Sequence, residues 1–242
     1  MYRNLILLFF FLCYGSYNSF AKQKKVLIFS KTAGFHHSSI KEGVIALQKM
    51  ARIHHFIADT TTDAKKFNTK NLRQYATVVF LNTSGNVFNS EQENAFQTYI
   101  KSGGGFVGVH SATNTEFEWP WFGRLVGAYF VKHPAQQFAD IKVTDPKTIA
   151  TSHLPAVWHK KDEWYNFKDI STDLHILLSV DESTYQGGTN GSNHPMAWYQ
   201  EFEGGRAFYT GLGHGPEAYT DPLFLEHLWG GLQYAMGSKK MK

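Results

Sequence analysis

Cysteine is almost absent from this sequence. Cys13 is the only cysteine among 242 residues, and it lies in an N-terminal stretch that has the character of a secretion signal. A basic start precedes the short apolar run at residues 5–14, and the small residues Ser19 and Ala21 match a signal peptidase site. We therefore expect residues 1–21 to be a signal peptide and the protein to be periplasmic or secreted. Cleavage there would remove the only thiol, which excludes disulfides, cysteine nucleophiles and thiolate metal sites from the mature chain.

The sequence also lacks a strong charge bias and a long hydrophobic run. It has 24 basic and 20 acidic residues, a formal net charge of +4, and the basic residues cluster only at residues 22–25 and 239–242. Without a basic stripe across the body, nucleic acid is not an expected partner. The apolar run at residues 5–14 is shorter than the roughly 20 residues that span a bilayer, so no membrane association is expected after signal removal.

Strand and helix patterns alternate through the first half of the mature chain. Apolar runs at residues 26–30, 54–58, 78–81 and 106–109 are typical of buried parallel strands. Apolar residues at helical spacing follow the capping patterns Ser38-Ser39 and Ser90-Glu91-Gln92-Glu93. This alternation predicts an α/β fold with a mostly parallel central sheet flanked by helices.

The second half is less regular. Its patterns predict short helices and strands at residues 119–126 (helix), 141–143 and 176–180 (strands), 196–199 and 206–210 (a strand pair joined by 203–205) and 222–235 (helix). No internal repeat, linker or composition shift divides the chain. Residues 22–242 are therefore expected to form a single domain, long enough to bury a full core.

One histidine stands out in the segment Gly103-Gly104-Gly105-Phe106-Val107-Gly108-Val109-His110-Ser111-Ala112. Small residues flank His110 at plus and minus two, which is the spacing of a nucleophile elbow, where a strand turns sharply into a helix. Hydrolases carry serine at the centre of such an elbow and glutamine amidotransferases carry cysteine. An imidazole in that place predicts proton transfer or metal binding instead.

Other polar residues follow predicted strands or lie in rigid loops. His36 precedes a predicted helix, His214 is bracketed by glycines in Gly211-Leu212-Gly213-His214-Gly215, and His133 and His194 each precede a proline that restricts their backbone. Because ligands of open α/β sheets bind at the carboxyl ends of the strands, we expect His36, His110, His133, His194 and His214 to line one pocket.

Carboxylates, amides and aromatic rings complete the predicted site. Glu163, in Asp162-Glu163-Trp164-Tyr165, lies beside aromatic residues that favour a raised pKa and a role as general acid or base. The turn Thr83-Ser84-Gly85 is placed to offer backbone amides above His110. Trp121, Trp164 and Tyr165 offer broad faces for stacking on sugar rings. No cofactor is expected, and the sequence has no His-Glu-x-x-His zinc motif; a divalent metal held by separate loops stays open.

With these residues in view, the chain resembles the trehalose-utilisation (ThuA-like) family. The stretches that carry the resemblance cover nearly the whole mature chain: residues 32–40, 80–85, 103–112, 119–121, 125–130, His133-Pro134 with Gln137, 162–167, His194-Pro195 and 205–214. The resemblance implies a flavodoxin-like or class I glutamine amidotransferase-like fold without the amidotransferase cysteine. The secretion signal is a departure from the trehalose-utilisation members and argues against a cytoplasmic role.

The resemblance also implies a role in carbohydrate catabolism. It points to a sugar derivative, a 3-keto glycoside or oxidised disaccharide, made by a partner sugar oxidoreductase. On this view His110, His214 and Glu163 are the catalytic acid–base groups for isomerisation, elimination or hydrolysis. The substrate-binding residues would be His36, Thr83, Ser84, Gly85, Trp121, His133, Gln137, Trp164, Tyr165 and His194. Two alternatives stay open: a carbohydrate-binding protein without catalysis, and a metal-dependent hydrolase that uses the histidines.

Overall fold

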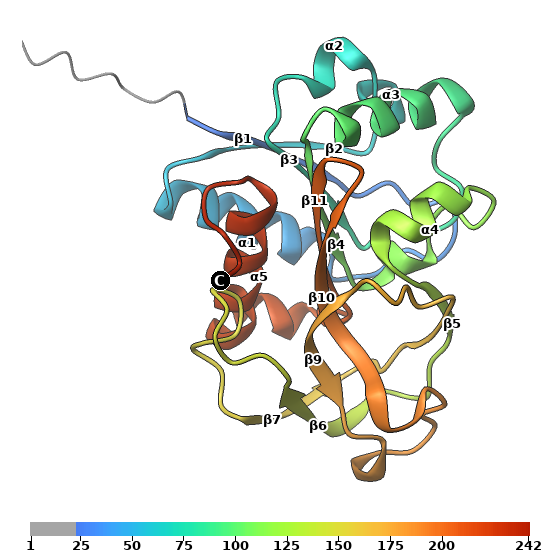
Figure 1. Cartoon of the computed structure of the whole chain (residues 1–242), viewed down its shortest axis with the longest axis vertical. Helices are drawn as coiled ribbons and strands as arrows, with labels where there is room; N and C mark the ends of the chain where they lie inside the picture. The colour runs from blue at the N-terminus through green and yellow to red at the C-terminus, as the bar shows by residue number, and fades with distance from the viewer. Residues whose placement is uncertain (1–22) are drawn as a thin grey trace, which may run out of the picture.

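A central β-sheet organises the protein (Figure 1). The computed structural model describes residues 23–242, so the predicted signal peptide at 1–21 lies outside the described residues. Within that range nine strands form one sheet in the order β2-β1-β3-β4-β11-β10-β9-β6-β7. Its first five strands pair in parallel: β2 (Ile57–Thr61), β1 (Lys25–Phe29), β3 (Thr77–Leu81), β4 (Gly105–Val109) and β11 (Gly205–Thr210). The predicted α/β fold with parallel strands is confirmed.

An antiparallel extension continues the sheet beyond β11. It consists of β10 (His194–Phe202), β9 (His175–Val180), β6 (Gln137–Val143) and β7 (Val157–Asp162), each antiparallel to its neighbour. The β10–β11 hairpin confirms the predicted strand pair. Apart from this sheet, β5 (Tyr129–Lys132) and β8 (Asn166–Lys168) form a separate two-stranded ribbon.

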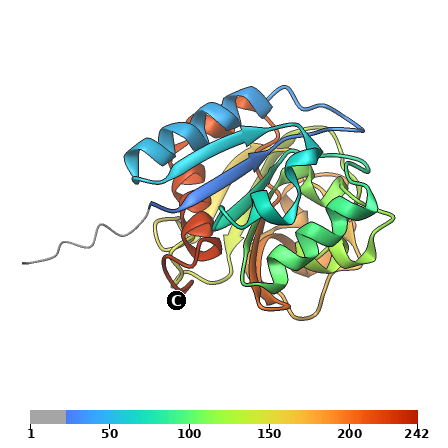
Figure 2. The same cartoon turned by 90° about the horizontal axis from the view of Figure 1, so that it is seen from above.

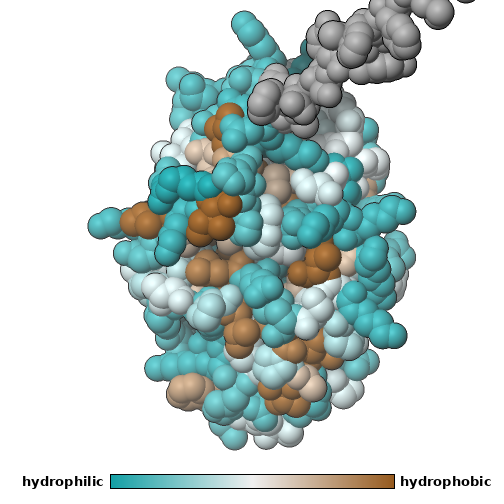
Figure 3. All heavy atoms as spheres, turned by 90° about the vertical axis from the view of Figure 1, so that its left-hand side faces the viewer, coloured by the Kyte–Doolittle hydropathy of each residue, from teal (hydrophilic) through white to brown (hydrophobic). Residues whose placement is uncertain are grey.

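Helices cover both faces of the parallel part (Figure 2). On one side lie α1 (Ile40–Ile53) and α5 (Pro222–Ala235); on the other lie α2 (Thr69–Leu72), α3 (Ser90–Lys101) and α4 (Pro120–Val126). The face that carries α1 and α5 shows small apolar patches scattered among hydrophilic side chains (Figure 3). Among residues 23–242, no helix combines the length and the apolar character needed to cross a membrane.

Several predicted boundaries differ from the structure, and two of the differences have a clear local cause. The strand expected at residues 54–58 begins three residues later, because α1 runs to Ile53 and the chain then turns at His55, whose φ is 57°. The capping box of α3 is formed by Asn89 and Gln92 rather than by Ser90. Asn89 takes the cap because its extended backbone lets its side chain accept from the amide of Gln92.

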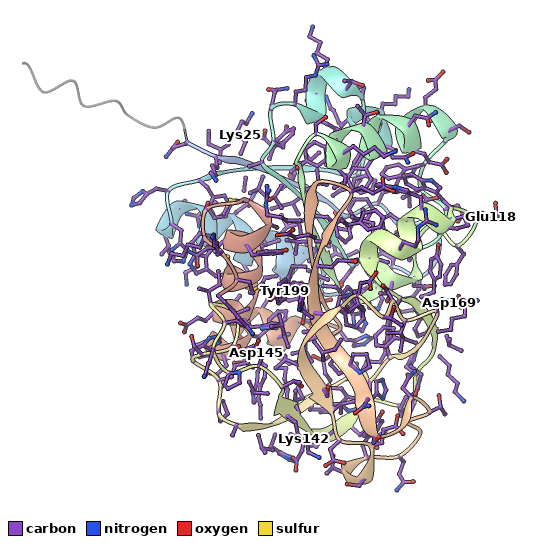
Figure 4. All side chains as sticks on the ribbon, in the orientation of Figure 1. Lys25, Glu118, Lys142, Asp145, Asp169 and Tyr199 are labelled. Carbon is purple, nitrogen blue, oxygen red and sulfur yellow. The ribbon has the colours of Figure 1, made fainter. Side chains whose placement is uncertain are left out.

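Aromatic side chains fill the space between the sheet and the α3–α4 layer, within the dense side-chain packing drawn in Figure 4. Phe80 of β3 lies with its ring centroid 5.3–5.9 Å from the rings of Phe29, Phe67, Phe88, Phe96, Phe106 and Phe122. Buried aromatic rings each remove a large apolar area from water. This cluster holds β4 against its helices and so fixes the strand that leads into His110.

Candidate functional site

His110 occupies a sharp turn at the carboxyl end of β4. Its φ is 47°, in the left-handed region that non-glycine residues rarely adopt, and the side chain is fully buried. The hydroxyl of Tyr209 donates to the His110 carbonyl at 2.7 Å and holds the turn. A Cβ at Gly108 would lie only 3.1 Å from the Ala112 Cβ. The turn therefore has room only for small residues at positions 108 and 112.

The orientation of the His110 ring is fixed by one hydrogen bond. Nδ1 lies 2.9 Å from the Gly211 carbonyl, and because a carbonyl only accepts, Nδ1 carries the proton. In a neutral imidazole the lone pair is then on Nε2, which faces Glu163 and His214.

Glu163 joins three of the predicted histidines. Its Oε2 lies 3.3 Å from His110 Nε2 and 3.0 Å from His214 Nδ1. Its Oε1 lies 3.1 Å from His133 Nδ1, and His110 Nε2 and His214 Nδ1 are themselves 3.2 Å apart. The structure therefore brings together His110, His133, His214 and Glu163, from four segments far apart in sequence.

Asp162 supports this arrangement from behind, a role that was not predicted from the sequence. Its Oδ1 accepts from the backbone amides of Glu163 and His214, at 2.9 and 3.2 Å, and its Oδ2 accepts from the amide of Gly213 at 3.1 Å. One buried carboxylate thus ties the loop after β7 to the loop after β11. The only sign of this role in the sequence is the adjacent acidic pair Asp162-Glu163.

His37, not His36, lies in this cluster. The His37 ring is buried and packs edge-to-face at 4.8 Å from His110 and 5.0 Å from His214. His36 is exposed, with Nδ1 3.2 Å from Thr32 Oγ1. The expectation that His36 faces the other histidines is wrong because the backbone after β1 turns its neighbour inward.

Burial and mutual contact shift the pKa values of these groups. Burial, with repulsion from His110 and His214, lowers the pKa of His37 to about 3. Burial alone would raise the pKa of Glu163, but its close contacts with the His110 and His214 side chains outweigh burial and hold that pKa well below its ordinary range. For His214, burial lowers the pKa while the Glu163 carboxylate raises it, and the net effect is a raised pKa.

Four of these side chains have the composition of a metal-binding set. One donor atom from each of His37, His110, Glu163 and His214 lies within 4.8 Å of every other. Imidazole nitrogen with a carboxylate is the ligand combination typical of zinc and other first-row divalent ions.

Tyr165 forms one wall of the site. Its ring centroid is 4.2 Å from that of His110 and 4.2 Å from that of Phe130, and it stacks at 5.7 Å on His133. Since the side chain is almost fully buried, it shapes the wall and offers little open face for a sugar.

His194 lies behind Tyr165 and does not line the site. Its Nε2 donates to the Tyr165 carbonyl at 2.7 Å, and its Nδ1 lies 2.8 Å from Glu182 Oε1 and 3.1 Å from the Tyr185 hydroxyl. Both ring nitrogens are therefore engaged within the protein. The prediction that His194 lines the same pocket as the other histidines is wrong, and its contact with the Tyr165 carbonyl positions Tyr165.

Three other predicted binding residues are also occupied by structural contacts. The Gln137 amide bonds to the backbone of Ala135 and Gln186 through both its nitrogen and its oxygen. Trp164 is fully buried and donates to the Gln137 carbonyl. Trp121 is buried in the aromatic core and donates to Glu203, on the turn that precedes β11, whereas the site follows β11. Their polar atoms and ring faces are not open to a sugar, so these predictions are corrected.

The turn Thr83-Ser84-Gly85 is fixed in the sheet rather than open above His110. The amide of Gly85 donates to the Asn114 carbonyl at 2.8 Å, and the Ser84 carbonyl accepts from the amides of Ala33 and Gly34. The Thr83 and Thr115 hydroxyls pair at 2.8 Å. Because the Gly85 amide is already engaged, it is not a free donor for a substrate oxyanion.

Comparisons with known proteins agree with the fold. A protein of Bacteroides uniformis described as ThuA-like is 26% identical, with a TM-score of 0.77 over 93% of this chain and 97% of that one. A second ThuA-like protein, from Parabacteroides merdae, is 21% identical, with a TM-score of 0.75 over 91% of this chain and 92% of that one. A cytoplasmic protein of Salmonella typhimurium shares the fold, with 10% identity and a TM-score of 0.62 over 87% of this chain and 98% of that one.

No curated protein matches the chain. The model of the family described as trehalose utilisation matches residues 25–235, which is nearly the whole of the described range and includes every residue of the His–Glu site. That family description indicates a carbohydrate-related role. The chain belongs to the trehalose utilisation (ThuA) family.

Proposed function

We propose that this protein acts on a 3-keto glycoside and that its first step removes a proton from a carbon next to the ketone. A ketone acidifies such a C–H bond because the negative charge left behind spreads onto the carbonyl oxygen. The step needs a base with a free lone pair and a group that stabilises charge on that oxygen. The family's description supports the carbohydrate class, and a sugar oxidoreductase would supply the ketone.

The observation that carries the proposal is the pairing of His133 with Glu163. The Nδ1 of His133 lies 2.9 Å from the Pro134 carbonyl and 3.1 Å from Glu163 Oε1. Both partners are acceptors, so Nδ1 carries the proton and the Nε2 lone pair is free. The side chain is 39% exposed, and a substrate can therefore reach it.

This geometry divides the roles differently from the sequence-based prediction. His110 is fully buried and its Nε2 already faces Glu163 and His214, so it is poorly placed to reach a substrate carbon. We assign proton abstraction to His133, with Glu163 holding its ring in the required tautomer as an acid–base pair does. We assign stabilisation of charge on the ketone oxygen to His214, and His110 is a positioning residue that contacts both Glu163 and His214.

The proton on His133 then has two possible destinations. Return to a carbon completes an isomerisation. Transfer to the glycosidic oxygen, as the C1–O bond breaks and a C1–C2 double bond forms, completes an elimination that releases an alcohol. Both outcomes share the first step, and the experiment targets that step.

The test follows hydrogen–deuterium exchange of an oxidised disaccharide in D₂O by NMR. The purified protein should accelerate exchange next to the ketone, and His133→Ala and Glu163→Gln should reduce the rate by about 10²–10⁴. His159→Ala is the matched control, because His159 is exposed and paired with Asp140 outside the site. Added imidazole should restore part of the His133→Ala rate.

Two results would contradict the proposal. Tight binding of oxidised disaccharides with no exchange and no product would identify a carbohydrate-binding protein instead. Unchanged exchange in His133→Ala would place the base elsewhere.

A further inference from the structure

Three donor atoms of the site form a closed triangle. His110 Nε2, His214 Nδ1 and Glu163 Oε2 are separated by 3.2, 3.0 and 3.3 Å, each atom being in contact with the other two. All three belong to buried or half-buried side chains. Water therefore has little access to these contacts, and the three atoms must satisfy one another.

No arrangement of protons gives a hydrogen bond along all three sides of this triangle. Each atom is either a donor or an acceptor along the directions in question, and three mutually contacting atoms cannot be divided so that every pair joins a donor to an acceptor. If His214 alone donates, His110 Nε2 and Glu163 Oε2 face each other as two acceptors. If both histidines donate to Glu163 Oε2, their two donor nitrogens lie 3.2 Å apart with no acceptor between them. Each assignment therefore leaves one pair of atoms in close contact with no hydrogen bond between them.

A metal ion at the centre satisfies all three atoms at once. Imidazole nitrogen and carboxylate oxygen bind zinc at about 2.0–2.2 Å. Two ligands at that bond length, about 90–109° apart around the ion, are separated by about 2.8–3.6 Å. All three sides of the triangle fall within this range.

The surrounding contacts prepare the ligands for a metal. The Gly211 carbonyl fixes the His110 tautomer that leaves Nε2 unprotonated, which is the usual outer contact of a metal-binding histidine. Asp162 fixes the backbone of both Glu163 and His214. His37 completes the set of four donors within 4.8 Å.

We propose that His37, His110, Glu163 and His214 bind one divalent first-row transition-metal ion, with zinc as the reference ion. A ligand set of three imidazoles and one carboxylate favours such an ion over Mg²⁺ or Ca²⁺, which prefer oxygen ligands. This inference rests on the same site as the proposed function and names its electrophile: a bound ion polarises a carbonyl oxygen as a Lewis acid. His133 stays outside the set, with its Nε2 free.

The test measures metal binding without substrate. Untagged protein is stripped with a chelator, titrated with ZnCl₂ and CoCl₂ by calorimetry, and analysed for bound metal after gel filtration. We expect one equivalent of metal and a rise in melting temperature on adding it. Co²⁺ should give the visible absorption of a nitrogen- and oxygen-ligated site.

Variants decide whether this cluster is responsible. Glu163→Gln and His214→Ala should weaken binding at least 100-fold, while His159→Ala, which alters an exposed histidine outside the cluster, should bind as the parent does. Melting curves confirm that each variant is folded. Absence of stoichiometric binding in the parent, or equal binding in Glu163→Gln and His214→Ala, would overturn the proposal.

The outcome is separable from that of the proposed function. Keto-sugar exchange by stripped protein that binds no metal would overturn the metal site and leave the proposed reaction standing. Stoichiometric metal binding that needs Glu163 and His214 would support the site even if no oxidised disaccharide is turned over.

Discussion

Replacing Asp162 with asparagine tests whether one carboxylate holds the two loops of the site together. Asp162 accepts three backbone amides, from Gly213, His214 and Glu163. If the asparagine oxygen takes the Oδ1 position, it still accepts from the amides of Glu163 and His214, but it lacks the negative charge of the carboxylate. Its NH₂ group then faces the amide of Gly213, and two donors meet.

The cost follows from these contacts. An unsatisfied buried amide costs about 1–3 kcal/mol, and loss of charge weakens each of the two remaining bonds by about 1 kcal/mol. The free energy of unfolding should therefore fall by about 3–5 kcal/mol, which corresponds to a drop in melting temperature of roughly 10 °C for a domain of this size.

Urea unfolding followed by circular dichroism measures this change. Asp140→Asn is the matched control, because Asp140 pairs with His159 at the surface and should change stability by less than about 1 kcal/mol. A loss below about 1 kcal/mol in Asp162→Asn would refute the idea that this carboxylate holds the loops.

Three further predictions concern other positions. His110→Ala should reduce turnover, because Glu163 and His214 lose the ring that both contact, and should lower the melting temperature, since the buried ring and its bond to Gly211 are lost. A folded variant with the parental rate would contradict this. Burial lowers the pKa of His227 to about 4. Between about pH 6.5 and pH 4 this imidazole is therefore unprotonated in the folded chain and protonated in the unfolded chain. The free energy of unfolding should fall as the pH drops through that range. His227→Asn should remove up to about 1.4 kcal/mol per pH unit from that slope, and urea titrations at several pH values that show equal slopes would argue against it. Gly105→Ala should destabilise the fold by about 1–3 kcal/mol or more, because its Cβ would collide with the Ala235 carbonyl; calorimetry with an unchanged melting temperature would exclude this.

The parallel half of the fold is predictable because its central strands β1, β3 and β4 are almost entirely apolar and buried. The added strand β7 carries His159, Lys160 and Lys161, and its buried and exposed residues alternate. Only the neighbouring strand β6 makes that segment a strand, so composition alone does not reveal it.

The candidate site was predictable in outline and not in detail. The elbow spacing marks His110, and the glycines mark His214, because both features constrain the backbone locally. His36 and His37 are adjacent in a loop without periodicity, so the sequence does not show which one faces inward. His194 resembles His133 in sequence, and only its contacts with Glu182 and Tyr185 in the folded chain show that its ring is engaged within the protein.

The contact between His110 and His214 also bears on how the protein folds. Their strands β4 and β11 are parallel neighbours, yet the two histidines are 104 residues apart in the chain. Closing a loop of that length costs about 4 kcal/mol of chain entropy, and non-local pairings of this kind form slowly. The site can exist only after β11 has docked beside β4, so during refolding its formation should coincide with completion of the sheet, and a ligand of the site would report the fully assembled protein alone.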